Sequence, residues 1–288
     1  MPRWSTLLAF AHARPRVRAE PAPHPRCQVA DLTRAYGEHA LQQLDFYSAG
    51  EGERPLVAFV HGGAWQFGDK ARRPADMKAP FARGEGWHFA SLNFRLVPEV
   101  GIAEMATDVA AGLAWLLAAD GGLGIDPRRV VLMGHSSGAH LAALVGTDPR
   151  YLTRMGLPME AIAGVIANDG AAYDARERSV RAEWLHRRLI APALPADPER
   201  AADLSPAWHA AQAPNAASFL ILHAARDHGA RQAQLLEAAL QQAGTPVERH
   251  GFAGSGVRAH VMLSRRFGTE GFPATDIARR WLRERFAR

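Results

Sequence analysis

Short, continuously apolar runs alternate with helical segments along most of this chain. The clearest run is Leu56–Val60, and similar runs follow at intervals that leave room for a helix between them. A run that is apolar at every position is typical of a strand buried on both faces of a parallel sheet. Strands joined through helices form right-handed crossovers. The alternation therefore predicts an α/β fold with a mainly parallel central sheet and helices on both faces.

The same patterns place the individual elements. Further strands are expected at Phe89–Phe94, Val130–Met133, Ala163–Ala167, Phe219–Leu222 and Val247–Phe252. Helices are expected at Ile102–Ala119, Ser137–Val145, Arg231–Gln242 and Asp276–Phe286. One interval, 171–217, separates two strands where a single helix would suffice, and it includes the helical pattern Arg178–Leu189. Such an interval predicts a small cap insertion near the substrate site.

Length and composition favour one domain. The chain has 288 residues, of which 48% are hydrophobic and 22% charged, which suits a globular enzyme. We expect a single domain at 27–288, preceded by a flexible N-terminal arm at 1–26 that is rich in proline and arginine. No stretch approaches the roughly 18 apolar residues of a membrane-spanning helix. The short run Trp4–Phe10 lacks the basic start of a signal peptide, so a cytoplasmic location is favoured over export.

The charge pattern and the absent motifs exclude several functions. The formal net charge of +5 comes from arginines that are scattered along the chain, with no nucleic-acid-binding signature, so no nucleic-acid partner is expected. No H-E-x-x-H arrangement and no G-x-G-x-x-G after the first strand is present. We therefore expect neither a metal nor an organic cofactor. Cys27 is the only cysteine, so no intramolecular disulfide can form.

The pentapeptide Gly134-His135-Ser136-Ser137-Gly138 fits the pattern G-x-S-x-G. It follows the predicted strand Val130–Met133 and opens a predicted helix, which is the context in which this pattern exposes a serine on a strained turn. The flanking glycines let neighbouring backbone pass without a Cβ clash. The sequence therefore predicts that Ser136 is a nucleophile.

A serine nucleophile needs a general base and an acid that orients it. In a strand-turn-helix arrangement of this kind the base comes last in chain order, which favours His260 over His250, since His250 lies within a predicted strand. For the acid, Asp227 follows the strand Phe219–Leu222 by a short turn. Asp169, at the end of the preceding strand, is the alternative, and we favour Asp227.

The stretch His61-Gly62-Gly63-Ala64-Trp65 follows the strand Leu56–Val60. A glycine-rich loop at this position supplies backbone amides to a developing oxyanion. We expect the donors to be the amides of Gly63 or Ala64, together with the amide of Ser137. The neighbouring Trp65 and Phe67 are candidates for lining a substrate pocket.

These motifs together resemble the carboxylesterase, lipase and kynurenine formamidase branch of the α/β-hydrolase superfamily. The resemblance spans roughly 40–285, and the matching stretches are HGGAW at 61–65, NFRLVPE at 93–99, GHSSGAHLAAL at 134–144, HAARD at 223–227 and the histidine in RAHVMLSRRFG. It implies a catalytic trio of Ser136, Asp227 and His260, an oxyanion hole at Gly63, Ala64 and Ser137, and no metal or organic cofactor.

The resemblance implies hydrolysis of a small-molecule ester through an acyl-serine intermediate. Hydrolysis of an N-formyl amide, as in kynurenine formamidases, uses the same groups and is the closest alternative; the HGG-x-W form ending at Trp65 is nearer to those enzymes. An alternative of another class is a non-catalytic binding protein on the same fold. The sequence leaves the oligomeric state and the physiological substrate open.

Overall fold

The computed structural model describes residues 29–71, 77–118, 122–177, 193–212, 214–254 and 256–287. Both the predicted N-terminal arm at 1–26 and the helical pattern Arg178–Leu189 lie outside these ranges. The strands are β1 (Leu32–Ala35), β2 (Gln43–Tyr47), β3 (Arg54–Val60), β4 (His88–Leu92), β5 (Ile125–His135), β6 (Gly164–Asn168), β7 (Phe219–Ala224) and β8 (Val247–Phe252).

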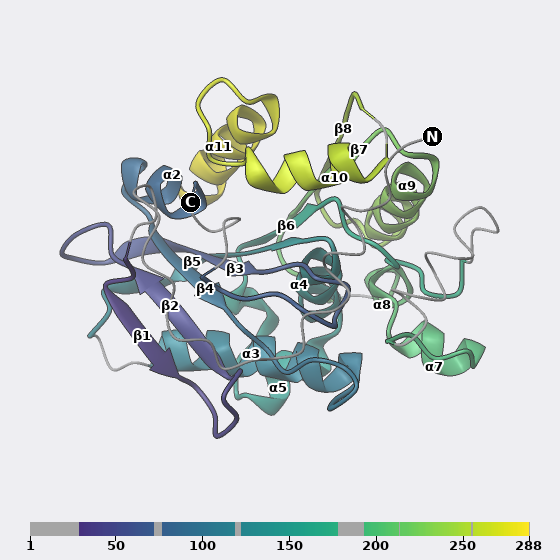
Figure 1. Cartoon of the computed structure of the whole chain (residues 1–288), viewed down its shortest axis with the longest axis horizontal. Coiled ribbons are helices and arrows are strands. Elements are labelled where there is room, and N and C mark those ends of the chain that lie inside the picture. The colour runs from purple at the N-terminus through teal and green to yellow at the C-terminus, as the bar shows by residue number, and fades with distance from the viewer. Residues whose placement is uncertain are drawn as a thin grey trace.

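These strands form one eight-stranded sheet in the order β1-β2-β4-β3-β5-β6-β7-β8 (Figure 1). The strands β3 to β8 are parallel to one another, whereas β2 is antiparallel to both β4 and the edge strand β1. This mainly parallel sheet is the one that the alternation of the sequence predicted. The order also puts β6 next to β5 and β7 one strand further away.

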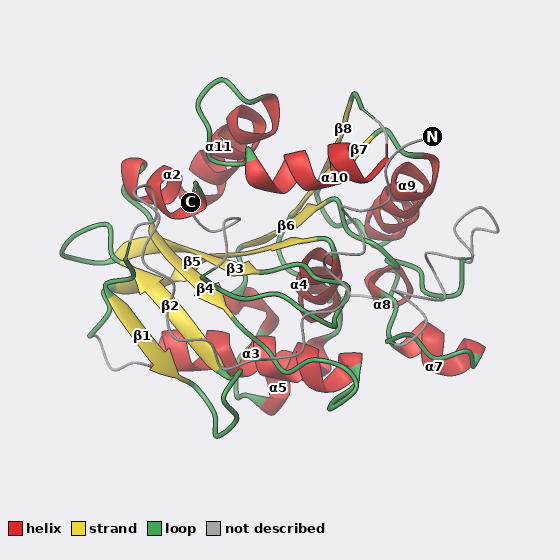
Figure 2. Ribbon diagram, viewed as in Figure 1, coloured by secondary structure: helices red, strands yellow, loops and turns green. Residues whose placement is uncertain are grey.

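Helices cover both faces of the sheet (Figure 2). They are α2 (Lys78–Gly84), α3 (Ile102–Ala118), α4 (Ser137–Thr147), α5 (Pro149–Arg154), α7 (Pro198–Asp203), α8 (Pro206–Ala210), α9 (Asp227–Gln242), α10 (Gly256–Arg265) and α11 (Pro273–Phe286), with a short 3-10 helix η1 (Met159–Ala161). The predicted helices correspond to α3, α4, α9 and α11; α10, which carries His260, was not predicted. In the part of the chain that the structure describes, no helix is long and apolar enough to span a membrane.

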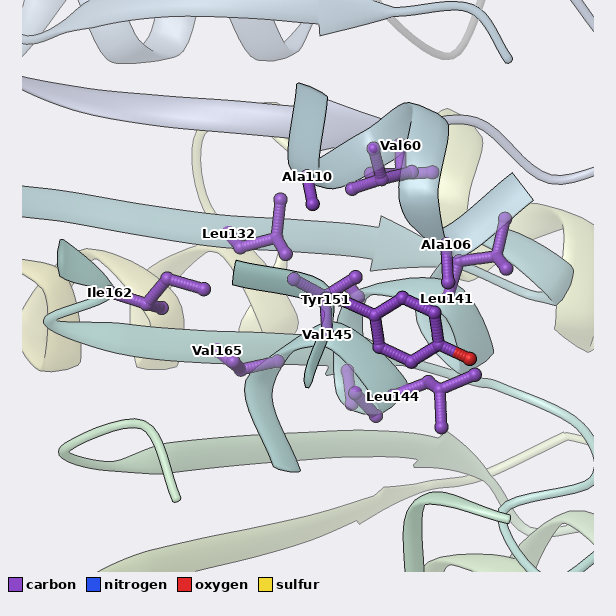
Figure 3. Packing of buried hydrophobic residues seen from close by; sticks show 14 of the residues in the cluster. Val60, Ala106, Ala110, Leu132, Leu141, Leu144, Val145, Tyr151, Ile162 and Val165 are labelled. Carbon is purple, nitrogen blue, oxygen red and sulfur yellow. The ribbon is translucent and has the colours of Figure 1, made fainter. Parts of the chain in front are cut away.

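Alternate residues of the buried strands pack into two separate hydrophobic cores, one on each face of the sheet. Val60 on β3, Leu132 on β5 and Val165 on β6 pack on the face that α3 and α4 cover (Figure 3). Val57 and Phe59 point to the opposite face, where they join residues of α2, α10 and α11. Because side chains of a strand alternate between the two faces, a strand buried on both sides must be apolar throughout. The two cores fix the carboxyl ends of β3, β5 and β6 relative to α10.

Candidate active site

Ser136 lies on the turn between β5 and α4, with φ 57° and ψ −122°. Its amide donates a hydrogen bond to the carbonyl of Asn168 at 3.1 Å, which ties the turn to the end of β6. A Cβ atom at Gly134 would lie 2.1 Å from the carbonyl oxygen of Gly138, and one at Gly138 would lie 2.2 Å from that of Val60. The two glycines are therefore required by the close packing of β3, β5 and α4 around the serine.

His260 stands between Ser136 and an aspartate. Its Nε2 is 3.0 Å from the Oγ of Ser136, and its Nδ1 is 2.7 Å from the Oδ2 of Asp169. An ionised carboxylate only accepts, so Nδ1 carries the proton and Nε2 is left to accept from the serine hydroxyl. The arrangement is that of a nucleophile, a base and an orienting acid.

The acid in this arrangement is Asp169 and not the preferred Asp227. Asp169 follows β6, the immediate neighbour of β5, and its φ of 49° turns the chain at that point. Asp227 lies in the first turn of α9, after β7, one strand further from Ser136. Chain order alone does not distinguish the ends of the two strands. In the fold, Asn168 at the end of β6 donates to the carbonyl of Leu263 on α10 at 3.2 Å, which holds α10 beside the end of β6. The alternative acid considered from the sequence is thus the one that contacts His260.

Asp169 is a buried, ionised carboxylate. Its side chain is completely buried, its Oδ1 accepts from the amide of Ala224 at 3.1 Å, and its Oδ2 is 3.0 Å from Nη2 of Arg226. Burial raises the pKa of Asp169, but the hydrogen bond from His260 and the charges of His260 and Arg226 outweigh it, and the pKa falls to about 2. The carboxylate is therefore negative at neutral pH.

His135, the first variable position of the pentapeptide, packs against His260. Its ring centroid is 4.6 Å from that of His260, and its Nε2 donates to the carbonyl of His260 at 3.1 Å. Burial, with the nearby charge of His260, lowers the pKa of His135 well below its ordinary value, so this imidazole is neutral. The sequence motif includes His135 but says nothing of this contact, because the partner is distant in the chain.

The loop after β3 is shaped by backbone contacts. Gly63 has φ 145°, and a Cβ atom there would lie 1.6 Å from the carbonyl oxygen of Phe67. The next residues, Ala64 and Trp65, have φ values of 52° and 61°, a region that costs energy for residues other than glycine. Among the described residues, the amides of Gly63, Ala64 and Ser137 donate to no protein acceptor. The loop lies against the serine, since a Cβ atom at Gly62 would be 3.0 Å from the Cβ of Ser136.

The two aromatic candidates for a pocket differ in burial. Trp65 is only 1% exposed and packs edge-on against His140 at a centroid distance of 5.3 Å. Trp65 is thus a core residue in this structure, contrary to the prediction of a pocket-lining role, while Phe67 is half-buried. His140 in turn donates through Nε2 to the carbonyl of Leu204, at 2.9 Å. This bond joins α4 to the segment between the cap helices α7 and α8.

A cavity of about 710 Å³ lies between the start of α3 and the cap helix α7. Its apolar lining includes Ile102, Leu194 and Leu204, and its polar lining includes Glu104 and Arg200. Ser136, His260 and Asp169 are not among its lining residues. Within the described ranges, no group of three or more His, Cys, Asp or Glu side chains could hold a metal ion.

The parallel sheet, the strained serine turn and the Ser136–His260–Asp169 line define an α/β-hydrolase. The sequence profile of the BD-FAE family matches residues 44–240, more than half of the chain, and the protein belongs to this family.

Curated relatives are esterases of greater length. Esterase LipC of Mycobacterium tuberculosis is 29% identical over 203 residues, which cover 67% of this chain and 50% of the relative. Isoprenylcysteine alpha-carbonyl methylesterase ICME of Arabidopsis thaliana is 36% identical over 110 residues, 38% of this chain and 25% of the relative. This chain therefore spans half or less of the length of these two relatives.

Solved structures support the fold. A truncated carbohydrate esterase from gut microbiota superposes with a TM-score of 0.72 at 18% identity, covering 93% of this chain and 100% of the other. Esterase 2 of Thermogutta terrifontis, phosphonylated by sarin, gives a TM-score of 0.72 at 20% identity, covering 90% and 96%. At such identities the likeness concerns the fold alone.

Proposed function

We propose that this protein is a serine hydrolase that cleaves small carboxylic esters through an acyl-serine intermediate. One observation carries the proposal: His260 lies within hydrogen-bond distance of both Ser136, at 3.0 Å, and Asp169, at 2.7 Å. A general base must lie within this reach of the proton that it removes. The esterase names of the relatives support the choice of an ester as substrate.

The reaction follows from the contacts. His260 Nε2 takes the hydroxyl proton as Ser136 Oγ attacks the ester carbonyl, and Asp169 stabilises the imidazolium that results. The amides of Gly63, Ala64 and Ser137 donate to the tetrahedral oxyanion. His260 then gives its proton to the leaving alcohol, which departs and leaves an acyl group on Ser136. A water molecule, activated by the same imidazole, releases the acid and restores the serine.

The test compares the wild-type protein with Ser136→Ala on p-nitrophenyl butyrate and on N-formylkynurenine, under identical conditions. We expect the wild type to cleave the ester with the higher kcat/KM, and Ser136→Ala to lose at least about a thousandfold in kcat. A matched control is Ser48→Ala. Ser48 follows β2, which is antiparallel to β4, so it lies at the opposite end of the strands from Ser136. It should retain wild-type activity.

Three results would contradict the proposal. Undiminished turnover in Ser136→Ala would show that Ser136 is not the nucleophile. A higher kcat/KM for N-formylkynurenine than for the ester would keep the mechanism and replace the substrate class with an N-formyl amide. A wild type that cleaves neither substrate would favour a non-catalytic role.

A further inference from the structure

Two donors, the imidazole of His260 and the guanidinium of Arg226, share one oxygen of the candidate catalytic acid. The Oδ2 atom of Asp169 is 2.7 Å from His260 Nδ1 and 3.0 Å from Arg226 Nη2. The same Nη2 atom is 3.4 Å from His260 Nδ1. Neither nitrogen can accept, since Nδ1 carries the proton that it donates to Asp169 and a guanidinium has no acceptor. The contact between Arg226 and His260 is therefore one between two donors that face the same carboxylate.

The surrounding chain leaves space for this guanidinium. Arg226 immediately precedes α9, and a Cβ atom at Gly229 would lie 3.1 Å from Arg226 Nη2 and 3.4 Å from Asp169 Oδ1. The Arg226 side chain is 24% exposed, whereas that of Asp169 is fully buried. The guanidinium thus lies along one side of the acid, partly open to solvent.

We propose that Arg226 is a positioning residue that holds Asp169 in place and opposes protonation of His260 in the resting enzyme, so that activity persists to lower pH. The inference rests on the proposed function, because it assigns Asp169 and His260 their roles in catalysis. A guanidinium keeps its charge at all relevant pH values. It therefore neutralises the buried carboxylate while the imidazole is neutral, as it must be before it can act as a base.

The two charges beside His260 act on its protonation in opposite directions. Asp169, after β6, favours the imidazolium, and Arg226, before α9, disfavours it. His135, at the end of β5, is neutral, and the buried Lys78 of α2 lies close enough to influence His135. Without Arg226 the carboxylate would act on His260 with its full charge. The imidazole would then be protonated, and inactive as a base, at a higher pH.

The test measures how fast a fluorophosphonate probe labels Ser136 as a function of pH, so that no choice of ester enters. In Arg226→Gln we expect the acid-side midpoint of the labelling rate to rise by about one pH unit, the lower end of shifts caused by an adjacent charge. Arg226→Lys, which keeps the charge, should stay within a few tenths of a unit of the wild type. Arg258→Gln removes a charge from the exposed surface of α10 and should leave the midpoint unchanged.

The outcomes separate this inference from the proposed function. Labelling of the wild type with an unmoved midpoint in Arg226→Gln would overturn the inference and leave the function intact. A wild type that is not labelled at any pH, or whose label survives in Ser136→Ala, would overturn both. Circular dichroism verifies folding of each variant; Arg226→Met, which retains the aliphatic stem, replaces Arg226→Gln if the latter does not fold.

Discussion

His260 Nδ1 and Asp169 Oδ2 are joined by a hydrogen bond of 2.7 Å across 91 positions of the chain. The bond links the turn after β6 to helix α10, and it fixes which nitrogen of His260 faces Ser136. An aspartate with the same chemistry, Asp227, begins the helix after the next strand. The assignment of the acid can therefore be tested by making the same substitution at Asp169 and at Asp227.

Replacing each aspartate by asparagine should separate their roles. Asp169→Asn places an amide where His260 needs a carboxylate, so we expect kcat to fall by about 10³ to 10⁴, as when a triad carboxylate is neutralised. Asp227→Asn should change kcat by less than about fivefold. Ester hydrolysis measured with both purified variants decides between them. The reverse order of the two losses would return the role of the acid to Asp227.

The loop at Gly63 should not tolerate a side chain. In Gly63→Ala the new Cβ would lie 1.6 Å from the carbonyl oxygen of Phe67, at a φ of 145°, so the loop must move and its amides with it. We expect kcat to fall by 10² or more, the usual effect of losing an oxyanion donor. Gly84→Ala is the control: a Cβ atom there meets nothing within 4 Å, so activity should be unchanged. Equal activity of the two variants would exclude the loop from catalysis.

Periodicity and motif context predicted the parts of this molecule that depend on neighbouring residues. The buried strands are apolar at every position, and the turn at Ser136 needs glycines at fixed spacing, so both are visible in the sequence. Asp169 was ranked below Asp227 because strand order in the sheet and the placement of α10 are properties of long-range packing. The contacts of His135 and Arg226 with His260 depend on the same packing. No local pattern distinguishes them from ordinary surface or core residues.

Lys78 should stabilise the helix that carries His260. The side chain is only 1% exposed, and its Nζ donates to the carbonyl of Ser264, near the end of α10, at 2.7 Å. The ammonium also lies 4.9 Å from the ring centroid of Phe59. Lys78→Met keeps the apolar stem but leaves this buried carbonyl without its donor, which should lower the free energy of unfolding by about 1–3 kcal/mol.

Urea denaturation at pH 7 measures the effect of Lys78→Met. Ser264→Ala is the matched control, because the short bond from Lys78 goes to the backbone carbonyl and survives the substitution, while the hydroxyl is 3.4 Å away. It should cost less than about 1 kcal/mol. A Lys78→Met variant as stable as the wild type would show that the ammonium contributes nothing to holding α10.

His140 should make the protein less stable in mild acid. Burial lowers its pKa to about 4, despite the hydrogen bond to Leu204, so the folded protein keeps this imidazole neutral at pH values where the unfolded chain, with a pKa near 6.5, has already bound a proton. Above about pH 6.5 both the folded and the unfolded protein have a neutral His140, and the free energy of unfolding is at its full value. As the pH falls from about 6.5 to about 4, only the unfolded chain binds the proton, so the free energy of unfolding decreases. The loss attributable to His140 is on the order of 3 kcal/mol.

Urea denaturation of the wild type and His140→Gln between pH 7 and pH 4.5 measures this contribution. The glutamine amide does not titrate and can still donate to the carbonyl of Leu204. The free energy of unfolding of the variant should therefore fall less between pH 7 and pH 4.5, because its unfolding takes up roughly one proton fewer. His135 is buried and titrates in the same direction, so part of the slope should remain. If the wild type and His140→Gln lose equal stability, the buried imidazole of His140 is not what weakens the fold in acid.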